Sequence, residues 1–250
     1  MPTAEFDDPR LAAIYDTVNT HDPDEQPRFV RRLAAEIQPG RGGTIVDLGC
    51  GAGLITRALA ALGHRVIGVD PSREMIGVAR ASPFGDRVQW IVGGADQIGT
   101  PGADLAIMTS HVAQFFITDD GWERALAALH AALRDGGRLG FESRNPGARA
   151  WERWTADHVT SVVDPVAGAI DWWTEVHDVC DGIVRYANHY RFAATGEELV
   201  SEARLRFRTL DELTRSLTEA GFTIERVDGD WHGRPVDATS PEHIMVARRA

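Results

Sequence analysis

The chain has 250 residues, of which 43% are apolar and 25% charged, a composition typical of a soluble globular protein. A domain of this length buries roughly 70–75% of its unfolded surface, so it needs no disulfide framework, and we do not expect Cys50 and Cys180 to pair. The formal net charge of −11 disfavours a nucleic-acid substrate, because affinity for phosphate backbones comes largely from Lys and Arg. No apolar run approaches the roughly 20 residues of a membrane span, and the N-terminus lacks the apolar segment of a signal peptide. We therefore expect a cytoplasmic protein with no membrane partner.

Along the chain, helix-periodic segments alternate with apolar runs of strand length. An amphipathic helix is expected over Asp24–Gln38, with Asp24 as its cap and Pro27 in its first turn. Further helices are expected over Leu54–Leu62, from Ser72 onward, over Gly121–Arg134 and over Leu210–Ala220, and are expected to end at Gly63, at Asp135-Gly136-Gly137 and at Gly221. Strands are expected over Ile45–Leu48, Val66–Asp70, Val88–Val92, Ala103–Met108, Gly137–Ser143, Phe222–Val227 and His243–Ala247. This alternation is typical of a mostly parallel sheet with helices on both faces.

A segment from about residue 147 to 208 interrupts the alternation. Within it, Asp181-Gly182 is expected to form a two-residue hairpin turn, because both residues tolerate the positive φ angles of such a turn. Pairing outward from this turn predicts four cross-strand pairs: Asp178 with Arg185, His177 with Tyr186, Trp173 with Tyr190, and Trp172 with Arg191. A third strand is expected over Ser201–Arg208, with Arg204, Arg206 and Arg208 on one face and Leu205 and Phe207 on the other. The layer is either a sheet with one solvated face, or a lid or dimer surface whose aromatic side meets an organic substrate.

The most informative motif joins the first two expected strands. Ile45–Leu48 ends in the cluster Gly49-Cys50-Gly51-Ala52-Gly53, a helix follows, and the next strand ends in Asp70. This order of strand, tight turn, helix, strand and carboxylate is typical of a nucleoside-binding half-fold. A dinucleotide site would have a third glycine where Leu54 stands, so an NAD-dependent oxidoreductase is disfavoured.

The spacing Asp47-x-Gly49-x-Gly51-x-Gly53 resembles the first motif of the class I S-adenosylmethionine-dependent methyltransferases, E/D-x-G-x-G-x-G. The resemblance is strong over about residues 40–145. It implies an α/β, Rossmann-like, doubly wound and mostly parallel seven-stranded sheet with an antiparallel last strand, plus an inserted antiparallel β layer before the sixth strand. It also implies one methyltransferase domain over 1–250, made of an N-terminal helical cap (1–39), a nucleoside-binding core (40–146), an inserted substrate cover (147–208) and the end of the core sheet (209–250).

The resemblance further implies that S-adenosylmethionine is the cofactor and S-adenosylhomocysteine the product. Asp70 would accept hydrogen bonds from the ribose hydroxyls. Relatives commonly show Gly-Asp-Ala after the third strand, whereas this chain has Gly93-Gly94-Ala95-Asp96, so the adenine contact is expected from the Ala95 backbone more than from Asp96. The donor-binding residues are expected to be Asp47, Gly49, Cys50, Gly51, Gly53, Asp70, Pro71, Met75, Ala95, Asp96 and Thr109. No metal is expected.

The catalytic candidates follow the fourth and fifth strands, at the sheet edge where open α/β folds bind ligands. His111 is either a general base or a capping or packing residue. Glu142, Arg144 and Asn145 either orient a polar substrate, or Glu142 and Arg144 form an ion pair that supports the turn. We expect His111 and Glu142 to be catalytic. Substrate contacts are expected from Tyr15, Arg144, Trp173, His177 and Tyr190, whereas Trp151 and Trp154 are expected to serve packing.

The sequence thus predicts methyl transfer to an oxygen or nitrogen of a small organic molecule by a monomer or homodimer. Two alternatives stay open. One is a non-methylating enzyme that retains S-adenosylmethionine as an electrostatic cofactor, and the other is a donor-binding regulatory protein.

Overall fold

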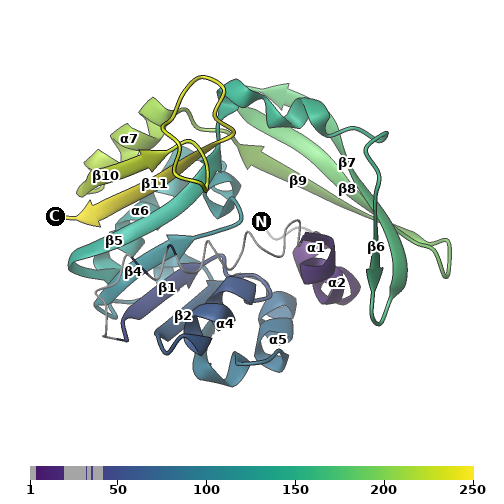
Figure 1. Cartoon of the computed structure of the whole chain (residues 1–250), viewed down its shortest axis with the longest axis horizontal. Helices are drawn as coiled ribbons and strands as arrows, with labels where there is room; N and C mark the ends of the chain where they lie inside the picture. Colours follow the sequence, from purple (N-terminus) through teal and green to yellow (C-terminus); the bar gives the residue numbers. More distant parts are fainter. Residues whose placement is uncertain (1–3, 20–31, 33–34, 36–41) are drawn as a thin grey trace.

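The computed structural model describes residues 4–19, 32, 35 and 42–250. It places an N-terminal helical segment between two sheets (Figure 1). The helix expected over Asp24–Gln38 falls outside the described residues, apart from Arg32 and Ala35. Within the described ranges, no helix combines the length and the apolarity needed to cross a membrane.

The larger sheet has seven strands in the order β10-β11-β5-β4-β1-β2-β3. Their bounds are β1 Thr44–Leu48, β2 Arg65–Asp70, β3 Val88–Val92, β4 Ala103–Met108, β5 Leu133–Arg144, β10 Phe222–Asp228 and β11 Glu242–Arg249. Neighbouring strands pair in parallel except at β11, which runs antiparallel to both β5 and β10. The predicted fold class is therefore confirmed.

Helices cover both faces of this sheet, and the alternation of side chains divides the core between them. On one face, Val46 and Leu48 pack with α6 (Asp119–Ala132) and α7 (Leu210–Glu219). On the other, Ile45 packs with α4 (Leu54–Ala61). A strand covered on both sides has no solvent face, which explains why β1 is apolar apart from Thr44 and Asp47. The next helix, α5 (Arg73–Ala81), begins as expected at Ser72, whose Oγ accepts the Met75 backbone N–H at 3.1 Å.

Helix α6 differs from its expected bounds at both ends. It begins at Asp119, because the Thr118 hydroxyl caps it by accepting the Gly121 N–H. The prediction that Asp135-Gly136-Gly137 ends this helix was wrong, since Leu133 already belongs to β5, is buried and pairs with Ala103. The glycines instead lie inside β5, where its pairing with β4 shifts register.

The second sheet is antiparallel and has four strands in the order β6-β7-β8-β9. Their bounds are β6 Thr160–Asp164, β7 Gly168–Cys180, β8 Ile183–Phe192 and β9 Glu198–Arg206. Strand β6 was not predicted. Arg204 is exposed and Leu205 is buried, as expected, but Arg208 lies beyond the end of β9. There it is buried over the Trp122 ring and paired with Asp119, so its predicted place on the arginine face was wrong.

The turn of the hairpin between β7 and β8 was predicted correctly, but the register of the two strands farther from the turn was predicted wrongly. Asp181 and Gly182 have φ angles of 49° and 72°, and Asp178 pairs with Arg185. The register then shifts between Val176 and Asp178, so that Val176 takes the expected place of His177 opposite Tyr186. The predicted partners of Trp172 and Trp173 were therefore wrong as well. Trp172 pairs with Tyr190 and Trp173 with His189, because one extra residue in a strand moves every later side chain by one position.

The N-terminal helices α1 (Ala4–Asp7) and α2 (Pro9–Asn19) connect the two sheets. Leu11 and Ile14 pack against β7 and β8, whereas Ala12 packs against Ala52 and Met75 beside the glycine turn. These helices hold the antiparallel sheet over the carboxyl edge of the parallel one (Figure 1).

Candidate active site

The turn after β1 is held in a conformation that favours glycine. Gly49, Gly51 and Gly53 have φ angles of 77°, 53° and 80°, in the left-handed region that residues with a Cβ rarely adopt. The backbone N–H groups of Gly49 and Cys50 donate to the Val69 carbonyl at 2.7 and 3.2 Å. The turn is thereby tied to the neighbouring strand, and its backbone lines the larger of two adjoining cavities at Gly49 and Gly51.

Gly53→Ala is expected to destabilise the fold by about 1–3 kcal/mol. Its φ is 80°, and a Cβ at this position would lie 2.5 Å from the Trp90 Cη2 atom. Urea unfolding measures the effect. Gly77→Ala is the matched control, because Gly77 is an exposed residue inside α5 with no atom within 4 Å of an added Cβ. That control is expected to stabilise the protein by about 0.4–1 kcal/mol. An equal loss in both variants would contradict the steric argument.

Asp70 ends β2 beside this turn and is 8% exposed. Its Oδ2 accepts the Gly51 N–H and its Oδ1 accepts the Ser72 N–H, each at 2.9 Å. Burial raises the pKa of this carboxyl, and the two backbone hydrogen bonds oppose that rise. Each carboxylate oxygen keeps a further lone pair, so the group can accept hydrogen bonds from a diol such as ribose.

The larger cavity has a volume of about 700 Å³ and lies between the glycine turn, Asp70 and the antiparallel sheet. Eight residues singled out in the sequence line it: Tyr15, Gly49, Gly51, Asp70, Pro71, Met75, Ala95 and His177. The volume is within the range of small-molecule and cofactor sites. Buried Asp47 lies behind the turn, where its Oδ2 accepts the Thr56 hydroxyl at 2.6 Å and its Oδ1 has no partner among the described residues. The volume of the cavity, the glycine turn and Asp70 fit a nucleoside.

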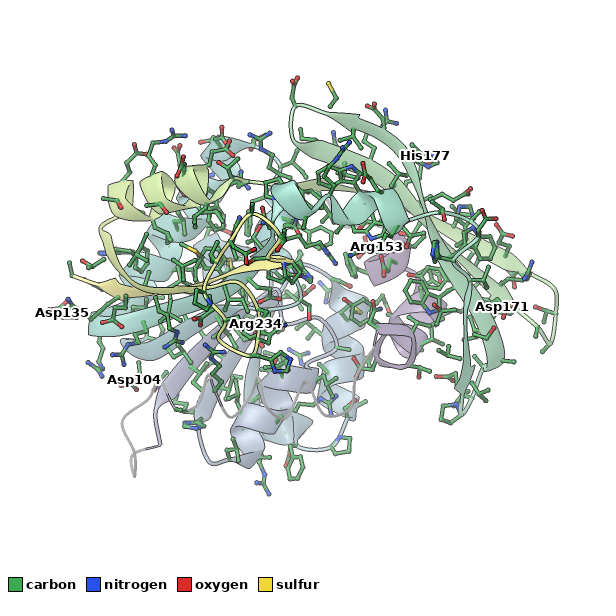
Figure 2. The ribbon with its side chains drawn as sticks, turned by 45° about the horizontal axis from the view of Figure 1, so that its top comes forward. Asp104, Asp135, Arg153, Asp171, His177 and Arg234 are labelled. Carbon is green, nitrogen blue, oxygen red and sulfur yellow. The ribbon has the colours of Figure 1, made fainter. Side chains whose placement is uncertain are left out.

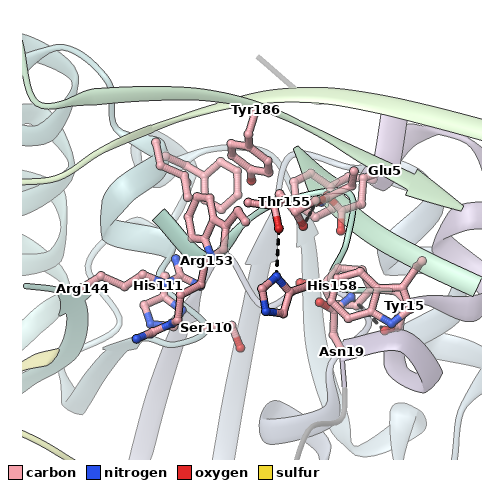
Figure 3. Close-up of a pocket in the computed structure, with 17 residues that line it drawn as sticks. Glu5, Tyr15, Asn19, Ser110, His111, Arg144, Arg153, Thr155, His158 and Tyr186 are labelled. Carbon is pink, nitrogen blue, oxygen red and sulfur yellow. Dashed lines mark hydrogen bonds between the residues drawn. The ribbon is translucent and has the colours of Figure 1, made fainter. Parts of the chain in front are cut away.

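The smaller cavity, of about 270 Å³, adjoins the first. The two share five lining residues: Phe6, Tyr15, Ser110, Phe115 and Tyr186. Figure 3 shows that polar side chains converge on the smaller cavity from several elements, with His111 and Arg144 on one side and Glu5 and Tyr15 on the other. The arrangement is that of two adjacent chambers, one beside the glycine turn and one beneath the antiparallel sheet.

His111 follows β4 and lines the smaller cavity. Ser110 and His111 have φ angles of 57° and 63°, a strained conformation outside glycine. Glu142 stabilises this bend, since its Oε1 accepts the His111 backbone N–H at 2.8 Å. The imidazole Nε2 lies 3.0 Å from Glu242 Oε1, so a carboxylate orients the ring and can stabilise its protonated form.

Burial raises the pKa of Glu142 to about 8, so at neutral pH the folded protein holds this group mainly in its neutral form. Because the pKa of Glu142 is raised in the folded protein, this carboxyl group loses its proton at a lower pH in the unfolded chain than in the folded one. This group's contribution to stability is therefore greatest below its unfolded pKa and falls as pH rises toward 8. Glu142→Gln is expected to reduce the fall in unfolding free energy between pH 5 and 8, by at most about 1.4 kcal/mol per pH unit. Chemical denaturation at several pH values tests this, and parallel profiles for the two proteins would contradict it.

The remaining predicted site residues lie outside both cavities. This group comprises Asp47, Cys50, Gly53, Asp96, Thr109, Glu142, Trp173 and Tyr190. Asp96 is exposed, and burial raises the pKa of the Cys50 thiol well above its usual range. Tyr190 donates its hydroxyl to Glu5 Oε1 at 2.8 Å, so it reaches the smaller cavity only through Glu5. Trp173 stacks on His189, with ring centroids 4.9 Å apart.

Several lining residues were not predicted as site residues from the sequence. They include Glu5, Phe6, Ser110, Phe115, Trp154, Thr155, His158, Trp172, Tyr186 and Asn188. Trp172 takes the place expected of Trp173, because the bulge at His177 reverses the faces of β7. The partner of His111 was also missed. Glu242 begins the last strand, and only the antiparallel pairing of β11 with β5 brings it opposite Arg144.

Comparisons with known proteins agree with this geometry. Residues 45–137 match a family model described as a methyltransferase domain. The ubiquinone/menaquinone biosynthesis C-methyltransferase UbiE of Rubrivivax gelatinosus is 38% identical over 112 residues, which is 45% of this chain and 42% of that protein. The match thus spans less than half the length of that relative. The cypemycin N-terminal methyltransferase of a Streptomyces species is 26% identical over 215 residues, 85% of each chain.

The fold is also shared with a solved structure over nearly the whole chain. CalS10, described as an amino pentose methyltransferase from Micromonospora echinaspora with S-adenosylmethionine bound, superposes with a TM-score of 0.69. The two chains are 22% identical, and the match covers 95% of each. The family model covers the stretch that builds the glycine turn and Asp70, and the fold agrees beyond it. Residues 45–137 are therefore similar to a methyltransferase domain, and the fold over nearly the whole chain is that of a methyltransferase with S-adenosylmethionine bound.

Proposed function

We propose that this protein transfers the methyl group of S-adenosylmethionine to an oxygen or nitrogen of a small organic molecule. The observation that carries the proposal is that the two cavities are adjacent, since both are lined by Phe6, Tyr15, Ser110, Phe115 and Tyr186. The larger cavity has the glycine turn and Asp70 that suit the donor. The smaller cavity has polar groups that suit an acceptor. Because the two cavities adjoin, the two reacting atoms can approach each other, which is the main requirement of this displacement.

When bound, the donor supplies an electrophilic methyl group that breaks its bond to sulfur as it bonds to the acceptor. The residues of this chain have three tasks in that step. Gly49, Gly51 and Asp70 bind the nucleoside, and Phe6 with Phe115 helps to exclude water from the junction. His111 takes the proton that a hydroxyl or an ammonium acceptor releases, and Glu242 stabilises the charge that the imidazole gains. Glu142 acts as a positioning residue through the His111 backbone.

The names of two relatives are consistent with a small or peptide-like acceptor. The relative aligned over 85% of this chain is named an N-terminal methyltransferase, and the superposed structure is described as acting on an amino pentose. A separate relative is named a C-methyltransferase, so the family names leave the acceptor atom open. We further propose that the chain works as one cytoplasmic domain, with residues 147–208 as the substrate cover, and that nucleic acid is not its substrate.

Incubation with methyl-labelled S-adenosylmethionine and a panel of metabolites tests the proposal. We expect label in one class of compound and one equivalent of S-adenosylhomocysteine for each product. Turnover of an organic substrate without S-adenosylhomocysteine would favour the non-methylating alternative. Tight donor binding without any turnover would favour a regulatory protein.

A further inference from the structure

The described charged side chains that line the smaller cavity are mainly basic, whereas the protein as a whole is acidic. The chain carries a formal net charge of −11. Nevertheless, among the described residues, the basic side chains that line this cavity are Arg144, Arg153, His111 and His158, and the acidic one is Glu5. Figure 3 shows Arg144, Arg153 and His111 gathered on the side opposite Glu5.

Arg144 is the half-buried member of the two arginines, whereas Arg153 is exposed at the rim. The Nη1 of Arg144 donates to the neutral Gln114 Oε1 at 3.0 Å, and the Arg144 guanidinium lies 5.3 Å from the centre of the Trp154 ring. Among the described residues, no carboxylate lies within 4.0 Å of its nitrogens. The ion pair between Glu142 and Arg144, one of the two alternatives that the sequence left open, is therefore not formed. A guanidinium carries five N–H donors and stays charged, and the hydrogen bond to Gln114 uses one of them, so further donors are available to a ligand in the cavity that Arg144 lines.

Two nearby carboxyl groups, those of Glu242 and Glu142, interact electrostatically with Arg144 but form no ion pair with it, and each keeps one buried oxygen without a hydrogen-bond partner among the described residues. Glu242 and Glu142 bond to the side chain and the backbone of His111. Both oxygens of Glu5 are occupied, since Tyr190 donates to Oε1 at 2.8 Å and Asn188 donates to Oε2 at 2.9 Å. Burial also raises the pKa of Glu5, which weakens it as a counter-ion. Among the described residues, Arg144 thus has acidic neighbours but no carboxylate at ion-pair distance, and its recorded hydrogen-bond partner is the neutral Gln114.

We propose that the methyl acceptor carries a carboxylate and that Arg144 binds this carboxylate in the smaller cavity. The inference rests on the proposed function, because it takes this cavity as the acceptor site. An arginine fork matches a carboxylate in a bidentate geometry that a lysine cannot supply. Binding through Arg144 leaves the rest of the acceptor to lie along Trp172, Phe115 and Tyr186, toward the wall shared with the larger cavity. The substrate class is therefore a small organic acid with an apolar body and a separate nucleophilic oxygen or nitrogen.

A binding experiment tests this without turnover. The protein is saturated with S-adenosylhomocysteine, and calorimetry measures binding of benzoate and phenylacetate against their primary amides, benzamide and phenylacetamide. Acid and amide have nearly the same shape and differ in charge. We expect the acids to bind on the order of 10- to 100-fold more tightly than the amides. Equal affinities, or no binding by either acid, would overturn the inference.

Variants assign the preference to one residue. Arg144→Gln is expected to abolish the difference between acid and amide, and Arg144→Lys to keep only part of it. Arg149→Gln is the matched control, because Arg149 is an exposed arginine on the adjoining loop that lines neither cavity. It is expected to leave the difference unchanged. An unaltered affinity of Arg144→Gln for S-adenosylhomocysteine verifies that this variant is folded.

An acid preference that survives in Arg144→Gln would refute the role of Arg144. The proposed function fails on a different result: acids that bind in the Arg144-dependent manner while no compound in the labelling panel gains a methyl group. The two hypotheses can thus be rejected separately.

Discussion

His111→Asn is expected to lower kcat by roughly 10²–10⁴-fold while leaving the affinity for S-adenosylmethionine unchanged. The imidazole lines the smaller cavity and is oriented by Glu242, whereas the donor-binding turn lies on other elements. Asparagine is the suitable replacement, because the φ of His111 is 63° and asparagine tolerates the left-handed region better than alanine. Steady-state kinetics with a labelled donor, together with calorimetry of donor binding, measure the two quantities.

His158→Asn is the matched control for this prediction. His158 lines the same cavity but is exposed, and its Nδ1 lies 2.9 Å from the Thr155 hydroxyl (Figure 3). We expect its kcat to stay near that of the unmodified protein. Equal losses of kcat and donor affinity in His111→Asn would indicate that His111 only supports the bend after β4.

Asp70→Ala is expected to weaken donor binding by about 1.5–3 kcal/mol, or roughly 10- to 150-fold in the dissociation constant. The variant removes the acceptor for the ribose hydroxyls. It also releases the Gly51 and Ser72 N–H groups that Asp70 now holds. Calorimetric titration with S-adenosylhomocysteine measures the change without the complication of turnover.

Two further variants sharpen the Asp70 experiment. Asp70→Asn keeps the shape of the side chain and loses its charge, so its affinity should lie between those of the unmodified protein and Asp70→Ala. Asp96→Ala removes an exposed carboxylate that lies outside both cavities and should leave affinity unchanged. An unchanged affinity in Asp70→Ala would remove Asp70 from the donor site.

Composition alone could not identify the functional side chains, because many charged residues of this chain lie at the surface. Figure 2 shows side chains such as Asp104, Asp135 and Asp171 at the periphery of the molecule. Surface charges of this kind pair with neighbours or with water, and each contributes little. The charges that matter for the proposed chemistry, at Asp70, His111 and Arg144, lie at the carboxyl ends of three parallel strands. The importance of each of these three charged groups can be judged only when its interaction partners in the fold are known.

Local rules were sufficient wherever a residue's own backbone preference decided the structure. The three glycines of the turn after β1 adopt positive φ angles, and Asp181-Gly182 forms its hairpin turn, because few other residues tolerate those angles. Ser72 caps α5 by the same kind of short-range effect. Such features depend on neighbours within a few positions and mark where helices and strands begin and end. The order of strands and helices in the core could therefore be predicted from the sequence.

Local rules failed where distant segments compete for the same position. At Leu133, burial in the core and pairing with Ala103 overrode the helix-stop signal of the following Asp-Gly-Gly. At His177, a bulge reversed the faces of β7 and put Trp172, instead of Trp173, against the cavity. Neither outcome depends on the residue itself, because both follow from what the rest of the fold packs against it.

The sequence by itself determined the glycine turn and the strand-ending carboxylate that we propose bind the donor, since both are properties of a short contiguous stretch. Only the tertiary structure decided the acceptor side. Glu5, His111, Arg144, Tyr186 and Glu242 come from five separate elements, and their meeting depends on the antiparallel pairing of β11 and on the helices that join the two sheets. A cavity built across such distances is specified by the packing of the whole chain, and no single segment of the sequence encodes it.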